Sequence, residues 1–200
     1  MTNSLKQFHK NIDSINIIDG IYIYFDKQVK AVDLSEIIRA QYVLLVSAFD
    51  YYIHDLVRDG MLKVFDGAKA PNNNYNKFSV SLKTLNLLLS NDDPNIRRQL
   101  LDNEIRNVIS KCSYQAPSNV ERALILIDIK SIWSFVAKEL HLDKEDIVKE
   151  LGLIVNRRNK IAHEADIDPI SNEKTPIDRD TLIYVKTFIT KIVEAIDKKI

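Results

Sequence analysis

Three residues in the C-terminal third of the chain carry side chains that can act together on a phosphate group. Arg158, Asn159 and His163 lie within the stretch RNKIAH. The imidazole of His163 titrates near neutral pH and can therefore accept or donate a proton. Arg158 stays cationic and can bind two oxygens of one phosphate, while the Asn159 amide both donates and accepts hydrogen bonds. This combination suits proton transfer at a phosphate ester whose negative charge increases in the transition state.

The same stretch is the C-terminal end of a predicted amphipathic helix. At about 100° per residue, Arg158 projects close to the middle of an apolar arc formed by Ile147, Leu151, Ile154, Val155, Ile161 and Ala162. Asn159 and His163 are four residues apart and share one shoulder of this arc. Arg157 points to one side and Lys160 nearly opposite, so neither is assigned to the candidate site. Because a buried guanidinium without a partner is costly, Arg158 must contact a carboxylate, carbonyl groups or an anion in a cleft.

A purely structural interpretation of Arg158 and His163 is also open. Cations near a helix C-terminus gain about 0.3–1 kcal/mol from the helix dipole. An arginine can lay its aliphatic stem on apolar surface while its charged group reaches water. A lone histidine is more often a solvated or hydrogen-bonded residue than a catalyst. The residue types alone therefore allow both a structural and a catalytic role.

A second pair of titratable residues, Asp50 and His54, lies one helical turn apart in an earlier predicted helix. That helix is apolar over most of its circumference, which is typical of a helix buried on more than one side. Both residues belong to its narrow polar strip. Asp50 is a candidate for orienting Arg158 or His163, and His54 is a weaker one. A solvated strip or a salt bridge in a dimer interface explains the pair equally well.

The elements that would position these residues are predicted to be helices. Glycine occurs four times and proline five times, and the strongest apolar periodicity is helical. N-cap side chains are expected at Asp93, Asp143 and Asp178, and capping boxes at residues 33–36 and 118–121. We therefore expect an all-α bundle of about six or seven helices with a long first core helix. The expected ranges are 3–15, 34–66, 79–90, 94–112, 119–140, 144–165 and 179–198.

Three segments outside these ranges are harder to assign. In residues 15–25, INIIDGIYIYF, β-formers flank Asp19 and Gly20 as in a two-residue hairpin. A helix with a break at Gly20 is favoured, because no other strand is evident for pairing. Residues 69–77 are rich in asparagine and residues 166–178 contain two prolines, so both are expected to be surface connections.

The composition indicates a single globular domain. Lysine and arginine together number 28, as do aspartate and glutamate, so no global positive field favours nonspecific nucleic-acid binding. The single cysteine, Cys112, cannot form an intramolecular disulfide, and the N-terminus lacks the features of a secretory signal. The longest apolar run, residues 42–49, is too short to span a membrane. We expect a cytoplasmic protein with no membrane association, metal or cofactor, since no histidines or cysteines have the spacing of metal ligands.

Three stretches resemble one family of helical domains. RNKIAH, residues 158–163, resembles the R-x4-6-H motif of the HEPN superfamily, named for higher eukaryotes and prokaryotes nucleotide-binding. The second position of that motif is commonly Asn, Asp or His, and Asn159 fits. Residues 34–58 resemble the long first core helix of the branch called RiboL-PSP-HEPN, and residues 110–124, SKCSYQAPSNVERAL, resemble its middle segment. Together they cover most of residues 30–197 in the order of that family.

The resemblance implies one HEPN-like domain over residues 1–200, with a core at about 30–198 and an N-terminal helical arm at 1–30. It implies a metal-independent endoribonuclease of the toxin or defence type. In such enzymes the ribose 2′-OH attacks the adjacent phosphate and leaves a 2′,3′-cyclic phosphate end. Arg158, Asn159 and His163 would be the catalytic residues.

The resemblance also implies partners. HEPN domains generally pair, and a homodimer would bring two copies of Arg158 and His163 to a common cleft. RNA and an antitoxin or defence-system protein are further implied partners. The alternative is a non-catalytic HEPN dimer that binds a protein or a nucleotide, with Arg158 in a structural role.

Overall fold

The computed structural model describes residues 1–29 and 32–200, and within these ranges the chain forms eight α-helices and no strand. The expected all-α fold is confirmed, with more helices than expected. Their bounds are α1 Asn3–Gln28, α2 Ser35–Phe65, α3 Leu82–Leu89, α4 Pro94–Ile109, α5 Pro117–Ile125, α6 Ile132–Leu140, α7 Lys144–His163 and α8 Arg179–Lys198, with a short 3-10 helix η1 at Tyr75–Lys77.

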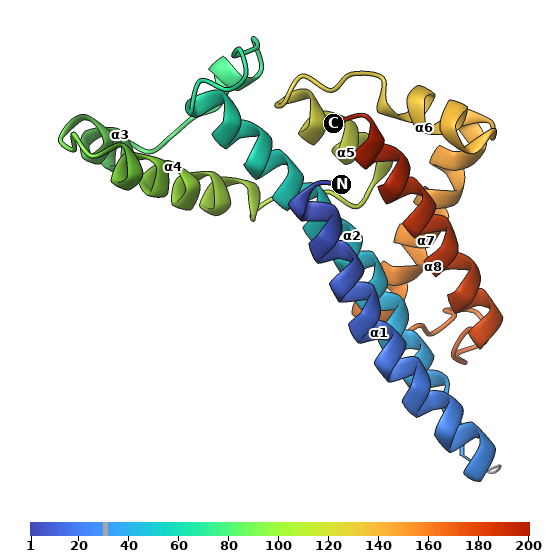
Figure 1. Cartoon of the computed structure of the whole chain (residues 1–200). Coiled ribbons are helices and arrows are strands. Elements are labelled where there is room, and N and C mark those ends of the chain that lie inside the picture. The colour runs from blue at the N-terminus through green and yellow to red at the C-terminus, as the bar shows by residue number, and fades with distance from the viewer. Residues whose placement is uncertain (30–31) are drawn as a thin grey trace.

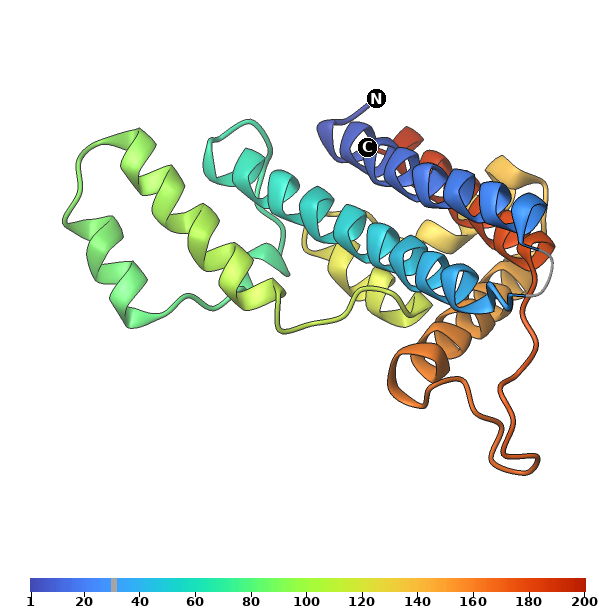
Figure 2. The ribbon, with the colours of Figure 1, turned by 90° about the horizontal axis from the view of Figure 1, so that it is seen from below.

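The long helix α2 is the centre of the bundle. It contacts α1, α4, α5, α7 and α8, as expected for a helix that is apolar on most sides. α1 runs beside α2, and α8 packs against both (Figure 1). The hairpin of α3 and α4 projects from the bundle at the C-terminal part of α2 (Figures 1 and 2). Among the helices so described, none is long and apolar enough to cross a membrane.

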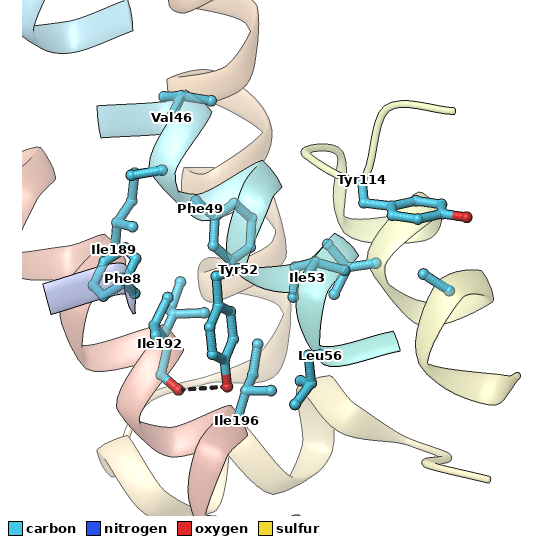
Figure 3. Packing of buried hydrophobic residues seen from close by; sticks show 14 of the residues in the cluster. Phe8, Val46, Phe49, Tyr52, Ile53, Leu56, Tyr114, Ile189, Ile192 and Ile196 are labelled. Atoms are coloured by element: carbon cyan, nitrogen blue, oxygen red, sulfur yellow. Dashed lines mark hydrogen bonds between the residues drawn. The ribbon is translucent and has the colours of Figure 1, made fainter. Parts of the chain in front are cut away.

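Large side chains of α2 form the core with α1 and α8. Phe49 and Tyr52 of α2 pack with Phe8 of α1 and with Ile189 and Ile192 of α8 (Figure 3). Burial of each such side chain contributes about 1.5–3 kcal/mol relative to its exposure to water. The Tyr52 hydroxyl keeps a hydrogen bond in this core because it donates to the Val193 carbonyl, at 3.4 Å. The core therefore fixes α2, against which α7 is placed.

The aspartate N-caps are confirmed, whereas both predicted capping boxes are wrong. Asp93, Asp143 and Asp178 each accept a backbone N–H in the first turn of α4, α7 and α8, at 2.7–2.8 Å. α5 begins two residues earlier than a Ser118 cap requires, because Pro117 occupies its first position. At α2 the N-cap position is Leu34, and Asp33 bonds the Ser35 N–H from outside the helix.

Two helix predictions are corrected by long-range packing. α1 continues through Gly20 without a break, so both the hairpin and the interrupted helix are wrong. A bidentate bond from Arg179 of α8 to Asp19 ties this part of α1 to the bundle. The helix expected at 119–140 is two helices, because Asp128 and Ser131 have left-handed backbones with φ of 63° and 52°. The expected boundary between arm and core, at residue 30, lies outside the described residues.

Gly60 of α2 permits a close approach of the segment between α5 and α6. A Cβ atom at this position would lie 2.5 Å from Cγ2 of Ile127, a buried residue. We expect Gly60→Ala to lower the free energy of unfolding by about 1–3 kcal/mol, measured by urea denaturation. Gly20→Ala is the matched control in α1, where no atom lies within 4 Å, and should raise stability by about 0.5–1 kcal/mol. An unchanged midpoint for Gly60→Ala would rule out the close contact.

Candidate functional site

The first turns of helix α7 lie in the core, whereas the last turns, which contain the candidate motif, are more exposed. Ile147, Leu151, Ile154 and Val155 are buried. The Tyr42 hydroxyl of α2 donates to the Ile154 carbonyl at 3.3 Å, and burial raises the pKa of this phenol, so that it remains a donor. Ala162 is exposed, and its expected place on the buried arc is wrong because the last turns of α7 leave the core. The exposed His163 is the last residue of the helix.

Arg158 is half-buried, and its charge is not neutralised by a carboxylate of the described residues. Its Nη1 donates to Oδ1 of Asn159 at 3.1 Å. Its Nε is buried and has no hydrogen-bond partner within residues 1–29 and 32–200, and none of the salt bridges there includes Arg158. A guanidinium has five N–H donors, and the bond to Asn159 uses one of them.

Arg157 has the opposite environment, although it is the neighbouring residue. Its Nη2 donates to Oδ2 of Asp166 at 2.8 Å and to the carbonyls of Thr175 and Pro176 at 3.1 and 3.3 Å. Arg39 of α2 donates from Nε to the same Oδ2 at 2.8 Å and from Nη2 to the Thr175 carbonyl at 2.7 Å. We call Arg39, Asp166 and Arg157 the arginine clamp. Asp166 is 1% exposed and Arg39 is 4% exposed, so these two residues form a buried ion pair, and Arg157 joins it from a partly exposed position.

The sequence alone does not predict this clamp. Residues 166–178 are expected to be a surface connection, and Arg157 lies outside the predicted site. The connection does extend beyond the end of α7 (Figure 2), but its first residues turn back into the protein. One signal was available, because Arg39 lies in a helix that the sequence predicts to be buried on more than one side. A guanidinium in that position requires a buried acceptor.

Asp50 and His54 lie together in a different place. Asp50 accepts the Tyr114 N–H at 2.6 Å, and its Oδ1 is 3.7 Å from Nδ1 of His54. Nε2 of His54 faces the carbonyls of Ile109 and Cys112 at 3.1 and 3.2 Å. Both residues line a surface pocket of about 400 Å³ between α2 and the end of α4. Tyr114 lies against the imidazole, and burial raises its pKa to about 12.

The structure brings Arg158, Asn159 and His163 onto one helix end but does not bring Asp50 and His54 to them within one protomer. Arg39 is the part of α2 that lies near the motif, because it binds the same Asp166 as Arg157 does. Asp50 is eleven residues further along α2, which corresponds to about 16 Å at 1.5 Å per residue. Within the ranges that the structure describes, no group of three or more histidine, cysteine, aspartate or glutamate side chains is placed to hold a metal ion.

The fold and the motif define the class of protein. A helical bundle in which a core helix ends with an arginine and a histidine five residues apart has the organisation of a HEPN domain. The chain belongs to the RiboL-PSP-HEPN family, whose sequence model matches residues 2–200. This match confirms the resemblance seen in residues 34–58, 110–124 and 158–163, and it extends over α1. A search of the curated proteins and of the solved structures finds no match.

Proposed function

We propose that the protein is a metal-independent endoribonuclease of the toxin or defence type that acts in the cytoplasm. Arg158, Asn159 and His163 would form its catalytic site. The environment of Arg158 is the observation that carries this proposal. Arg157 is held by Asp166, whereas Arg158 keeps N–H donors without partners among the described residues, on the helix end that also carries the exposed His163. An anion such as an RNA phosphate would satisfy those donors.

The residues suit cleavage by the ribose 2′-OH. In that reaction a base removes the 2′-OH proton, the 2′-oxygen bonds to phosphorus, and the bond from phosphorus to the 5′-oxygen breaks as an acid protonates that oxygen. His163 can perform one of these proton transfers. Arg158 would stabilise the charge on the pentavalent phosphorus, and Asn159, already bonded to Arg158, would fix the direction of the guanidinium.

One imidazole serves only one of the two proton transfers at a time, so the proposal includes a homodimer. A second copy of the chain would supply the other His163 and another Arg158 to a common cleft. In the same dimer Asp50 and His54 would support the motif only across the interface, because about 16 Å of α2 separates them from the motif within one protomer. A toxin or defence role further implies an antitoxin or another protein that controls the activity.

The test is cleavage of cellular RNA by the purified protein in EDTA. We expect cleavage to persist in EDTA, and we expect RNA with 2′-O-methyl groups throughout to stay intact because its nucleophile is blocked. Sedimentation velocity of the same samples should show a dimer. Binding of RNA or of a nucleotide without any cleavage would instead support the alternative, a non-catalytic HEPN dimer, and a strict monomer would contradict the composite site.

A further inference from the structure

The chain makes an unusual turn directly after the motif. Ala165 and Asp166 both have left-handed backbones, with φ of 49° and 60°. Residues with a Cβ atom rarely adopt this conformation, and two in succession persist only where the surrounding structure holds them. The turn leads the chain back, so that the Asp166 N–H donates to the Lys160 carbonyl at 3.0 Å, the same carbonyl that accepts the Glu164 N–H at the helix end. The strained turn therefore lies against the last turn of α7.

The arginine clamp holds this turn in place. Asp166 accepts from Arg157, which precedes the motif, and from Arg39 of α2. The Asp166 carbonyl also accepts the Thr175 N–H at 2.9 Å, which adds the returning part of the loop. The bond between Arg157 and Asp166 thus joins the residue before the motif, residues 158–163, to a residue after it. The bond from Arg39 to the same Asp166 fixes this arrangement to the central helix.

Apolar packing at this end of α7 comes from Ile161, which is partly buried against the core. Ala162, His163 and Glu164 are exposed, so the residues that follow Ile161 lie outside the core. Terminal helical turns fray when neither packing nor capping holds them. Catalytic groups lose rate when they move by as little as about 1 Å. The clamp therefore adds to the packing of Ile161, and it can keep His163 at a fixed position relative to Arg158.

We propose that Asp166 is a positioning residue that acts through the arginine clamp to hold His163 and Arg158 in their reactive arrangement. This inference rests on the proposed nuclease function for its kinetic consequence, but its structural consequence can be measured without RNA. Asp166 itself is buried and would not touch the substrate.

The test compares Asp166→Asn with a matched variant at another ion pair whose aspartate is buried. Asparagine keeps the size of aspartate and tolerates the left-handed backbone, but it lacks the charge that binds two guanidinium groups. Asp19→Asn is the control, because Arg179 donates to Asp19 at 2.9 and 2.7 Å in a pair that joins α1 to α8 away from the motif. That pair holds the pKa of the Asp19 carboxyl below its usual value, chiefly through the hydrogen bonds from Arg179.

We expect Asp166→Asn to lower kcat for RNA cleavage by about 10- to 100-fold, with KM nearly unchanged. The His163 imidazole signals in NMR spectra of the RNA-free protein should shift or broaden, while those of His9, His54 and His141 stay in place. Asp19→Asn should leave kcat and the His163 signals nearly unchanged. If Asp166→Asn does not fold, Arg157→Gln is the substitute, because Arg39 still neutralises Asp166 in that variant.

Two results would overturn the inference. One is an Asp166→Asn protein whose kcat, at equal folded fraction, equals that of Asp19→Asn. The other is a His163 signal that is the same in the wild-type protein and in Asp166→Asn. If the wild-type protein cleaves no RNA, the proposed nuclease function fails, and the His163 signal alone then decides whether Asp166 positions the histidine.

Discussion

Replacement of His163 with alanine is expected to lower kcat for RNA cleavage by about 10²–10⁴-fold, because a positioned proton donor or acceptor typically contributes that factor. The side chain is exposed at the end of α7, so its removal should leave folding intact. Single-turnover cleavage of a labelled RNA in EDTA measures the effect, and circular dichroism verifies the fold.

Arg158→Ala should lower the same rate by about 10²–10³-fold, the usual effect of losing one donor to a developing negative charge. Arg158→Lys should recover only part of the loss, since an ammonium group keeps the charge but not the two-pronged geometry. Lys160→Ala is the control, because Lys160 is an exposed cation of the same helical turn. Equal rates for Arg158→Ala and Lys160→Ala would exclude a specific role for Arg158 and leave only general attraction to RNA.

Arg39→Met should have the largest effect on stability, lowering the free energy of unfolding by about 3 kcal/mol. Removal of one partner from a buried ion pair costs about 3–5 kcal/mol, and the lower end applies here because Arg157 still binds Asp166. Urea denaturation measures the change. The second variant, Arg39→Met with Asp166→Asn, should be less destabilised than the sum of its single changes, since the buried charge is also removed.

Lys174→Met supplies the matched control for this prediction. Lys174 pairs with Glu36 close to the clamp, but both side chains are about half exposed or more, at 47% and 61%. Exposed pairs contribute about 0–1 kcal/mol, so this variant should be almost as stable as the wild-type protein. A loss for Arg39→Met no larger than that for Lys174→Met would show that the clamp does not stabilise the fold.

Local chemistry was enough to predict much of the fold. The aspartates before α4, α7 and α8 are N-caps, and the periodicity of α2 correctly indicated a helix buried on several sides. The prediction of a break at Gly20 failed because packing on α2 and α8 outweighs the weak helix propensity of one glycine. The division between α5 and α6 has no glycine or proline to mark it, and it depends on buried contacts such as that of Ile127 with Gly60.

The candidate site shows the same division between local and long-range information. The spacing of Arg158, Asn159 and His163 fixes their order on α7. Sequence alone could not separate the environments of Arg157 and Arg158, because Arg157 is held by an aspartate that follows the helix. That aspartate also binds Arg39, which is 127 residues away in the chain. The left-handed turn at Ala165 and Asp166 contains no glycine, so no residue type in the sequence predicted it.

The chemistry of the RNA ends is the most direct test of the proposed activity. Fragments made in EDTA by the wild-type protein and by His163→Ala can be compared by mass spectrometry of their 3′ ends. We predict 2′,3′-cyclic phosphates in the wild-type sample and none above background in the variant, because only attack by the neighbouring 2′-OH leaves that end. Fragments with 3′-hydroxyl ends, or the same cyclic ends in both samples, would contradict catalysis by Arg158 and His163.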